Sequence, residues 1–161
     1  MNTIPAQYTS VISTVREALV AGYGARLVSL AVFGSIARGV ATPESDIDLL
    51  IVANGLPNGR MSRVREFASM ENTLLSRHPE LSRYELSPII KTPHEVALGS
   101  PLFWDMTEDV IILLDEGGFL AHSLQKVKER LVQLKARKVV RGDAWYWVYK
   151  GDYTPGEVFE I

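Results

Sequence analysis

Two short apolar segments place the strongest limits on the fold of this chain. Leu27–Phe33 (LVSLAVF) and Asp46–Val52 (DIDLLIV) each contain an apolar run typical of a buried β-strand. Two further strands are expected over Arg83–Lys91 and Val110–Leu114. Pro88 cannot donate a backbone hydrogen bond, so the third strand is expected at a sheet edge or with a bulge.

Helical patterns alternate with these strands. Apolar residues recur every three or four positions over Thr9–Tyr23, Ser62–Arg77 and Phe119–Arg137, which indicates three amphipathic helices. Thr92-Pro93-His94-Glu95 is a capping box with proline at the first helical position, and Ser100-Pro101 repeats the cap and the proline, so two short helices are expected there. The alternation predicts one α/β (α+β) domain over residues 1–161.

Composition excludes several classes of protein. The N-terminal MNTIPAQYTS lacks a signal sequence, and no apolar run approaches the roughly 20 residues that span a bilayer, so we expect a cytoplasmic protein without membrane contact. The absence of cysteine excludes disulfides and cysteine-ligated metals. With 17 Lys and Arg against 19 Asp and Glu, the net charge of −2 argues against bulk nucleic-acid binding.

The turn after the first strand has the residues of a phosphate site. Gly34 has no side chain, so a phosphate can approach its backbone closely, and Ser35 supplies a hydroxyl donor. Arg38 can add a fixed positive charge, and Gly39 can let the chain reverse toward the second strand. Each residue alone is a weak signal.

Two carboxylates follow at the start of the second strand. Asp46 and Asp48 are two positions apart, so on a strand their side chains share one face. Asp-x-Asp alone is usually a turn or a solvated strand end. Beside a buried strand, however, paired carboxylates raise one another's pKa unless a cation lies between them, and such an oxygen pair suits Mg²⁺. Together with the phosphate turn, the pair predicts phosphoryl or nucleotidyl transfer.

Gly34-Ser35, ten residues, and then Asp46-x-Asp48 resembles the signature of the DNA polymerase β-like nucleotidyltransferase superfamily. The short chain is similar to its minimal nucleotidyltransferases (MNT), which are often paired with HEPN ribonucleases in toxin–antitoxin modules. The resemblance implies a small mixed β-sheet flanked by helices. It also implies two Mg²⁺ ions at Asp46 and Asp48, triphosphate binding at Gly34 and Ser35, and transfer of a nucleoside monophosphate, commonly AMP from ATP, to a hydroxyl.

The resembled family usually has a third carboxylate on a later strand. Glu85 is the candidate here, as a metal ligand or as the group that activates the attacking hydroxyl, with Arg83 and Ser87 expected on the same face. The alternative interpretation is a solvated residue or a partner of Arg83. Asp105 and the Glu108-Asp109 pair are weaker substitutes, because they precede a strand in a loop.

The sequence does not identify the acceptor of the nucleoside monophosphate. The resemblance favours a hydroxyl on a HEPN-family toxin, and a small molecule such as an aminoglycoside is an alternative. A second alternative is an antitoxin-like module that neutralises its partner by contact alone.

The C-terminal tail from about residue 139 interleaves positive charge with aromatic rings. The segment Ala144–Lys150 (AWYWVYK) could pair as a last strand and pack its rings on the domain, or it could contact a partner. Because all three tryptophans, including Trp104, lie after residue 100, we also expect apolar surface covered by a second subunit, as in a homo-oligomer.

Overall fold

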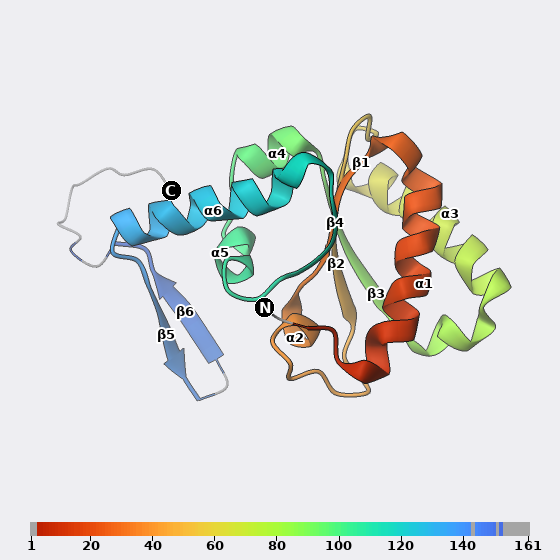
Figure 1. Ribbon diagram of the computed structural model, residues 1–161, viewed down its shortest axis with the longest axis horizontal. Coiled ribbons are helices and arrows are strands. Elements are labelled where there is room, and N and C mark those ends of the chain that lie inside the picture. Colours follow the sequence, from red (N-terminus) through yellow and green to blue (C-terminus); the bar gives the residue numbers. More distant parts are fainter. Residues whose placement is uncertain (1–2, 143, 151, 153–161) are drawn as a thin grey trace.

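A four-stranded mixed sheet forms the centre of the computed structural model, which describes residues 3–142, 144–150 and 152. The strand order is β3-β2-β1-β4 (Figure 1). β1 is antiparallel to β2 and β4, whereas β3 is parallel to β2. The strands are β1 (Leu27–Val32), β2 (Ile47–Ala53), β3 (Leu86–Lys91) and β4 (Ile111–Asp115). The expected α/β fold with a mixed sheet is confirmed.

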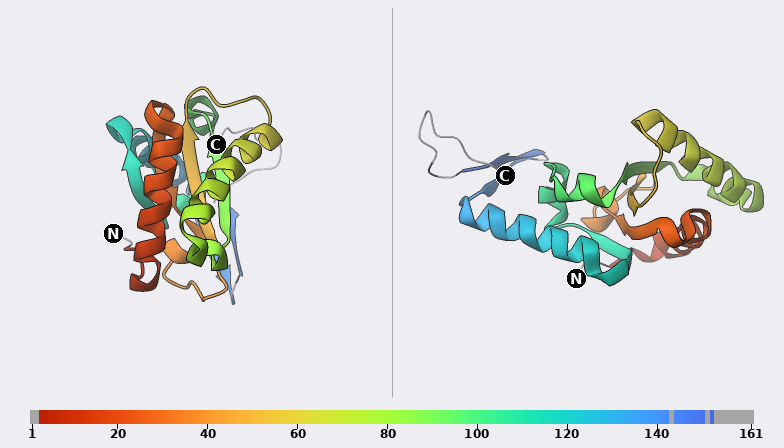
Figure 2. Two further views of the ribbon diagram at one scale, coloured as in Figure 1. Left: turned by 90° about the vertical axis from the view of Figure 1, so that its right-hand side faces the viewer. Right: turned by 90° about the horizontal axis from the view of Figure 1, so that it is seen from above.

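Helices cover both faces of this sheet (Figures 1 and 2). The longer helices are α1 (Ala6–Tyr23), α3 (Arg60–Arg77) and α6 (Phe119–Gln133). The short ones are α2 (Gly34–Ala37), α4 (Pro93–Ala97) and α5 (Leu102–Met106), with 3₁₀ turns at Gly24–Arg26, Pro79–Arg83 and Glu116–Gly118. Among the described residues, none of the helices has both the length and the apolar character needed to cross a bilayer.

Strand β2 separates two hydrophobic clusters. Ile47, Leu49 and Ile51 are fully buried in the cluster that includes α1 and α3. Leu50 and Val52 point the other way, into the cluster formed with α4, α5 and α6. Because side chains alternate along a strand, Asp48 faces the same side as Leu50. The burial pattern of β2 therefore decides which face of the sheet carries the carboxylate.

Strand β3 is an edge strand, as Pro88 predicted. Its start was predicted wrongly. The strand begins at Leu86, because residues Pro79–Arg83 form a 3₁₀ turn that ends α3 and returns the chain to the sheet. Arg83 is thus outside the strand, where its guanidinium stacks on the Tyr84 ring at 4.8 Å and donates to the Tyr84 hydroxyl at 2.7 Å. Glu85 lies just before the strand.

The chain after α6 forms a separate hairpin of β5 (Arg137–Arg141) and β6 (Ala144–Val148). The predicted last strand is present, but it pairs with β5 and does not join the main sheet. The predicted end of the preceding helix at Arg137 is wrong. Helix α6 ends at Gln133, and Lys135 takes a positive φ of 51° that turns the chain into β5. The hairpin lies at the end of the molecule opposite α3 (Figure 2).

The rings of this hairpin cover Trp104 within the same chain. Trp104 is 6% exposed, and its ring lies 6.4 Å from that of Trp147 and 4.7 Å from that of Tyr149. The hairpin itself leaves Tyr146 and Tyr149 exposed. The position of Trp104 in the sequence therefore gives no support to a subunit interface, since its apolar surface is already buried.

Helix α4 begins with the predicted capping box. The backbone N–H of Glu95 donates to the Thr92 hydroxyl at 3.2 Å, and the backbone N–H of Thr92 donates to Glu95 Oε2 at 2.7 Å. The same carboxylate binds the Arg63 guanidinium at 2.6 Å and so joins α4 to α3. The hydrogen bond from Arg63, followed by that from the Thr92 backbone, lowers the pKa of Glu95 to about 2.

The Glu95→Gln variant is expected to lower the free energy of unfolding by about 1–2 kcal/mol near pH 7, because a charge-assisted bond is lost from a side chain that solvent partly screens. The ordinary pKa of 4.5 falls to about 2 on folding, so the contribution is complete above about pH 4.5 and disappears as the pH falls through about 2. Urea unfolding at pH values between these limits should show that the free energies of unfolding of the variant and the parent become equal as the pH falls. Glu80→Gln, at a more exposed carboxylate, is the control, and a deficit that does not change with pH would contradict the assignment.

Candidate active site

The turn after β1 and the start of β2 are joined by a backbone hydrogen bond. The N–H of Phe33 donates to the carbonyl of Asp48 at 3.1 Å, which holds the first residue of α2, Gly34, against β2. The short helix then closes on itself, since the N–H of Arg38 donates to the Gly34 carbonyl at 3.1 Å. The structure thus brings together the glycine turn and the carboxylate strand that the sequence suggested.

Gly34 is in direct contact with the Asp48 carboxylate. Its φ is +70°, a conformation that side chains with a Cβ rarely adopt. A Cβ at this position would also overlap Asp48 Oδ2. One reason for glycine at this position is the close approach of a phosphate. The structure adds a second reason, which is that only glycine leaves room for the carboxylate.

The charge of Asp46 acts on Asp48. Asp46 is exposed just before β2, and Asp48 is partly buried. Burial raises the pKa of Asp48, the negative charge of Asp46 raises it further, and the Arg38 guanidinium opposes both effects. A pair of like charges at the edge of a buried strand is the arrangement that a divalent cation relieves. The oxygen donors of this pair therefore fit Mg²⁺.

Gly39 completes the reversal of the chain. Its φ is +74°, and its N–H donates to the Ile36 carbonyl at 3.1 Å. A Cβ on Gly39 would have no neighbouring atom within 4 Å, so this glycine is required by backbone conformation alone. Ile36 and Ala37 are buried, which fixes the turn to the core.

Comparison with known proteins agrees with this geometry. A family model described as a nucleotidyltransferase domain matches residues 12–101, which include α2, β2 and β3. The chain belongs to the nucleotidyltransferase family. A Methanocaldococcus jannaschii protein, provisionally named a protein adenylyltransferase, is 30% identical over 115 residues, covering 70% of this chain and 76% of the relative.

Solved structures give weaker likenesses. A toxin–antitoxin crystal structure with AMP-PNP has a TM-score of 0.46 at 12% identity and covers 76% of this chain and 91% of its own. A provisionally named nucleotidyltransferase from Sulfolobus solfataricus has a TM-score of 0.42 at 22% identity and covers 67% and 83%. Because both scores lie below 0.5, the family assignment rests on the sequence matches.

Glu85 lies just before β3, next to the start of β2. The N–H of Ile47 donates to the Glu85 carbonyl at 2.8 Å, and Ile47 pairs with Leu86 in the parallel register. The Glu85 side chain is exposed, and its charge acts on Glu71 of α3, whose pKa burial and Glu85 raise. Among the described residues, no three His, Cys, Asp or Glu side chains gather closely enough to hold a metal ion. The role of Glu85 as third carboxylate stays a prediction.

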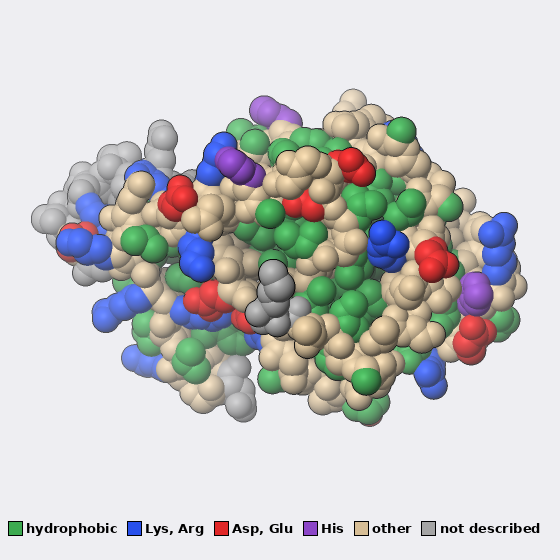
Figure 3. Space-filling model, in the orientation of Figure 1, with side chains coloured by type: hydrophobic (Ala, Val, Ile, Leu, Met, Phe, Trp, Pro, Cys, Tyr) green, Lys and Arg blue, Asp and Glu red, His purple; other side chains and the backbone are tan. Residues whose placement is uncertain are grey.

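The weaker substitutes for Glu85 have a different role. Lys138 of β5 lies 3.3 Å from Asp105, 3.2 Å from Glu108 and 3.8 Å from Asp109. Acidic and basic side chains lie together on this side of the molecule in Figure 3. These carboxylates therefore anchor the hairpin to the domain.

One contact in this region was not anticipated from the sequence. The guanidinium of Arg38 lies 4.9 Å from the ring centroid of Trp145 on β6. The hairpin thus reaches the turn that carries Gly34. Only the interleaving of cations and aromatic residues in the tail pointed to such stacking, and it gave no indication of the partner.

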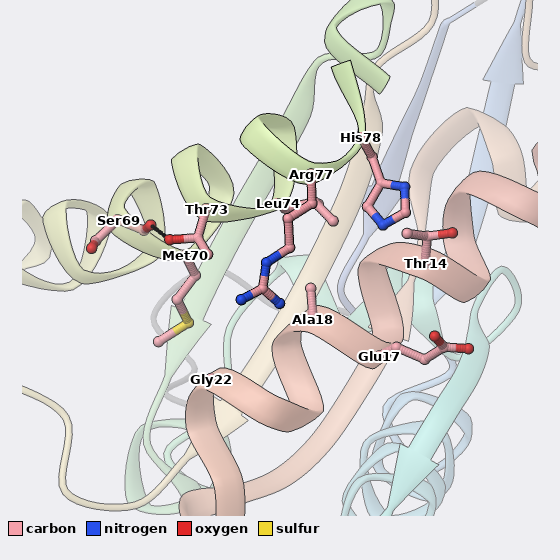
Figure 4. Close-up of a pocket in the computed structure, with 10 residues that line it drawn as sticks. All are labelled: Thr14, Glu17, Ala18, Gly22, Ser69, Met70, Thr73, Leu74, Arg77 and His78. Atoms are coloured by element: carbon pink, nitrogen blue, oxygen red, sulfur yellow. Dashed lines mark hydrogen bonds between the residues drawn. The ribbon is translucent and has the colours of Figure 1, made fainter. Parts of the chain in front are cut away.

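Two hollows on the described surface lie away from the carboxylate pair. One of about 350 Å³ opens between α1 and α3 and is shown in Figure 4, with Thr14, Glu17, Arg77 and His78 on its walls. It is on the sheet face opposite Asp48. Another, of about 490 Å³, lies beside β3 and the start of α3, with Arg60, Arg63 and Lys91 on its walls. Neither contains Gly34 or the carboxylate pair.

Proposed function

We propose that this nucleotidyltransferase is a Mg²⁺-dependent protein adenylyltransferase that transfers AMP from ATP to a hydroxyl on a HEPN-family partner, as an antitoxin. The observation that carries the reaction is the Asp46/Asp48 pair, in which the Asp48 carboxylate lies against Gly34 and is acted on by the charge of Asp46. A protein acceptor is supported by the name of the M. jannaschii relative. The choice of a HEPN partner is supported by the resemblance to minimal nucleotidyltransferases.

Substrate binding uses the turn after β1. In this proposal the triphosphate lies over Gly34 and Ser35, where the absent side chain and the hydroxyl admit phosphate oxygens. Arg38 adds a positive charge next to Asp48. Asp46 and Asp48 would hold two Mg²⁺ ions, which when bound neutralise phosphate charge and lower the pKa of the acceptor hydroxyl.

The reaction is an in-line displacement. The acceptor oxygen forms a bond to the α-phosphorus of ATP, and the bond from that phosphorus to the oxygen bridging the β-phosphate breaks. Pyrophosphate takes the electron pair and leaves. Glu85, which lies just before β3 and accepts a backbone hydrogen bond from Ile47, takes the hydroxyl proton in this proposal.

The proposed reaction is tested by following a label from ATP to the acceptor. We expect the full chain, with Mg²⁺ and a HEPN-family protein encoded in the same operon, to transfer label from the α-phosphate of ATP to that protein. ATP labelled at the γ-phosphate should transfer none, and removal of Mg²⁺ with EDTA should stop the reaction. Transfer of the γ-label, or labelling of an added aminoglycoside in place of the protein, would contradict the proposal.

A contact-only antitoxin is the second candidate. It is favoured by the Glu85 side chain, whose charge acts on Glu71 and which forms no three-carboxylate group with Asp46 and Asp48 among the described residues. Inhibition of the partner separates the two functions. Neutralisation that requires ATP and Mg²⁺ supports transfer, whereas equal neutralisation without either supports contact alone.

A further inference from the structure

The C-terminal hairpin contacts the proposed triphosphate site through one aromatic ring. Arg38 follows α2, and its guanidinium lies 4.9 Å from the ring centroid of Trp145. The Lys138 ammonium lies 5.0 Å from the centroid of the same ring. A cation over an indole face is attracted by the ring's quadrupole, and this attraction limits the rotamers that a long arginine side chain samples.

The Trp145 ring is itself held in place by α5. Its indole N–H donates to Asp105 Oδ1 at 3.0 Å, and the indole N–H of Trp147 donates to the same oxygen at 3.0 Å. Lys138 lies 3.3 Å from this oxygen and pairs with Trp147 across the hairpin. Three donors on one carboxylate oxygen give the ring a fixed position, although Trp145 is 36% exposed.

Alternation along β6 separates the two sets of aromatic side chains. Trp145 and Trp147 share the face that meets α5, and Tyr146 points the other way, with the Arg141 guanidinium 5.9 Å from its ring centroid. Tyr146 is therefore a matched control, because it is an aromatic residue on the same strand for which the described part of the chain shows no contact with Asp105 or Arg38.

We propose that Trp145 is a positioning residue that holds the Arg38 guanidinium in place for the triphosphate of the bound nucleotide. The inference rests on the proposed function, and it makes the hairpin a part of the nucleotide site. Without the indole face, Arg38 would have to be ordered when the nucleotide binds, and affinity would fall by the free energy of that ordering. A ring that stacked on the nucleotide base instead would act independently of Arg38.

The experiment measures affinity by calorimetry with α,β-methylene-ATP, which cannot undergo cleavage between the α and β phosphates. We expect Trp145→Ala to weaken binding about three- to tenfold, Trp145→Phe to restore binding to within about twofold, and Tyr146→Ala to bind like the parent. In an Arg38→Ala background, Trp145→Ala should add nothing, because the residue acts through Arg38. In the transfer assay, KM for ATP should rise by the same factor while kcat stays within about twofold.

A structural readout checks the geometry without any nucleotide. The Nε–H resonance of Arg38 in the free protein should be shifted by the indole ring current, and the shift should be lost in Trp145→Ala. Parent-like affinity of Trp145→Ala would overturn the inference, and so would a further loss of affinity in the Arg38→Ala background. If the parent binds no nucleotide, both the proposed function and this inference are wrong. If the parent binds nucleotide and Trp145→Ala binds it equally well, only this inference is wrong.

Discussion

The Asp48→Asn variant is expected to lose roughly a thousandfold in the rate of AMP transfer while it keeps its fold. Asparagine has nearly the same shape, so the contact with Gly34 can be retained. The substitution removes the charge that a divalent cation requires and leaves Arg38 without its opposing carboxylate. Transfer of α-labelled phosphate at saturating ATP and Mg²⁺ measures the loss, and circular dichroism checks the fold.

Variants of other carboxylates serve as comparisons for the activity of Asp48→Asn. Glu44 is an exposed carboxylate in the same loop, and Glu44→Gln should retain parent activity. Asp46→Asn should resemble Asp48→Asn. Glu85→Gln should lower kcat about a hundredfold if Glu85 takes the hydroxyl proton, with Glu71→Gln as its control. Equal activity of Asp48→Asn and Glu44→Gln would show that the chemistry lies elsewhere.

The Gly34→Ala variant is expected to lose both stability and nucleotide binding. A Cβ at a φ of +70° strains the backbone by about 1–2 kcal/mol, and its overlap with Asp48 Oδ2 displaces the carboxylate in addition. We therefore expect a decrease of about 2–4 kcal/mol in the free energy of unfolding. Affinity for α,β-methylene-ATP should fall by more than about a hundredfold, because the carboxylate pair and the open turn are lost together.

Gly39 separates the two causes of this loss in stability. Its φ of +74° is close to that of Gly34, but a Cβ there would have no neighbour within 4 Å. Gly39→Ala should therefore lower stability by the strain alone, about 1–2 kcal/mol. Urea unfolding of both variants measures the difference between their free energies of unfolding. This difference is the cost of the overlap with Asp48. Equal losses in stability would mean that Gly34 is needed for its conformation only.

Local signals in the sequence predicted much of the fold and the centre of the site. Apolar runs located four strands, and the capping box at Thr92 and Glu95 has the predicted bonds. Pro88 placed β3 at the edge. The spacing from Gly34 to Asp48 was informative because the turn and the strand it leads into meet through one hydrogen bond, from Phe33 to Asp48. Each of these features depends on residues near one another in the chain.

Other predictions failed where the local pattern was ambiguous. The helical periodicity through Arg137 continued past the true end of α6, because the positive φ at Lys135 has no strong sequence signal. The strand predicted from Arg83 began three residues later, since the 3₁₀ turn at Pro79–Arg83 competes with strand pairing. The tryptophans suggested a second subunit; the hairpin covers Trp104 within the chain, and a homo-oligomer stays a prediction.

The sequence by itself determined the succession of strands and helices along the chain, the glycine turn and the paired carboxylates, because periodicity and short-range spacing encode these features directly. Only the tertiary structure decided that Asp48 lies against Gly34, that the charge of Glu85 acts on Glu71, and that Trp145 lies over Arg38. Contacts of this second kind join side chains from different elements, and they depend on how buried faces pack, which no local pattern specifies.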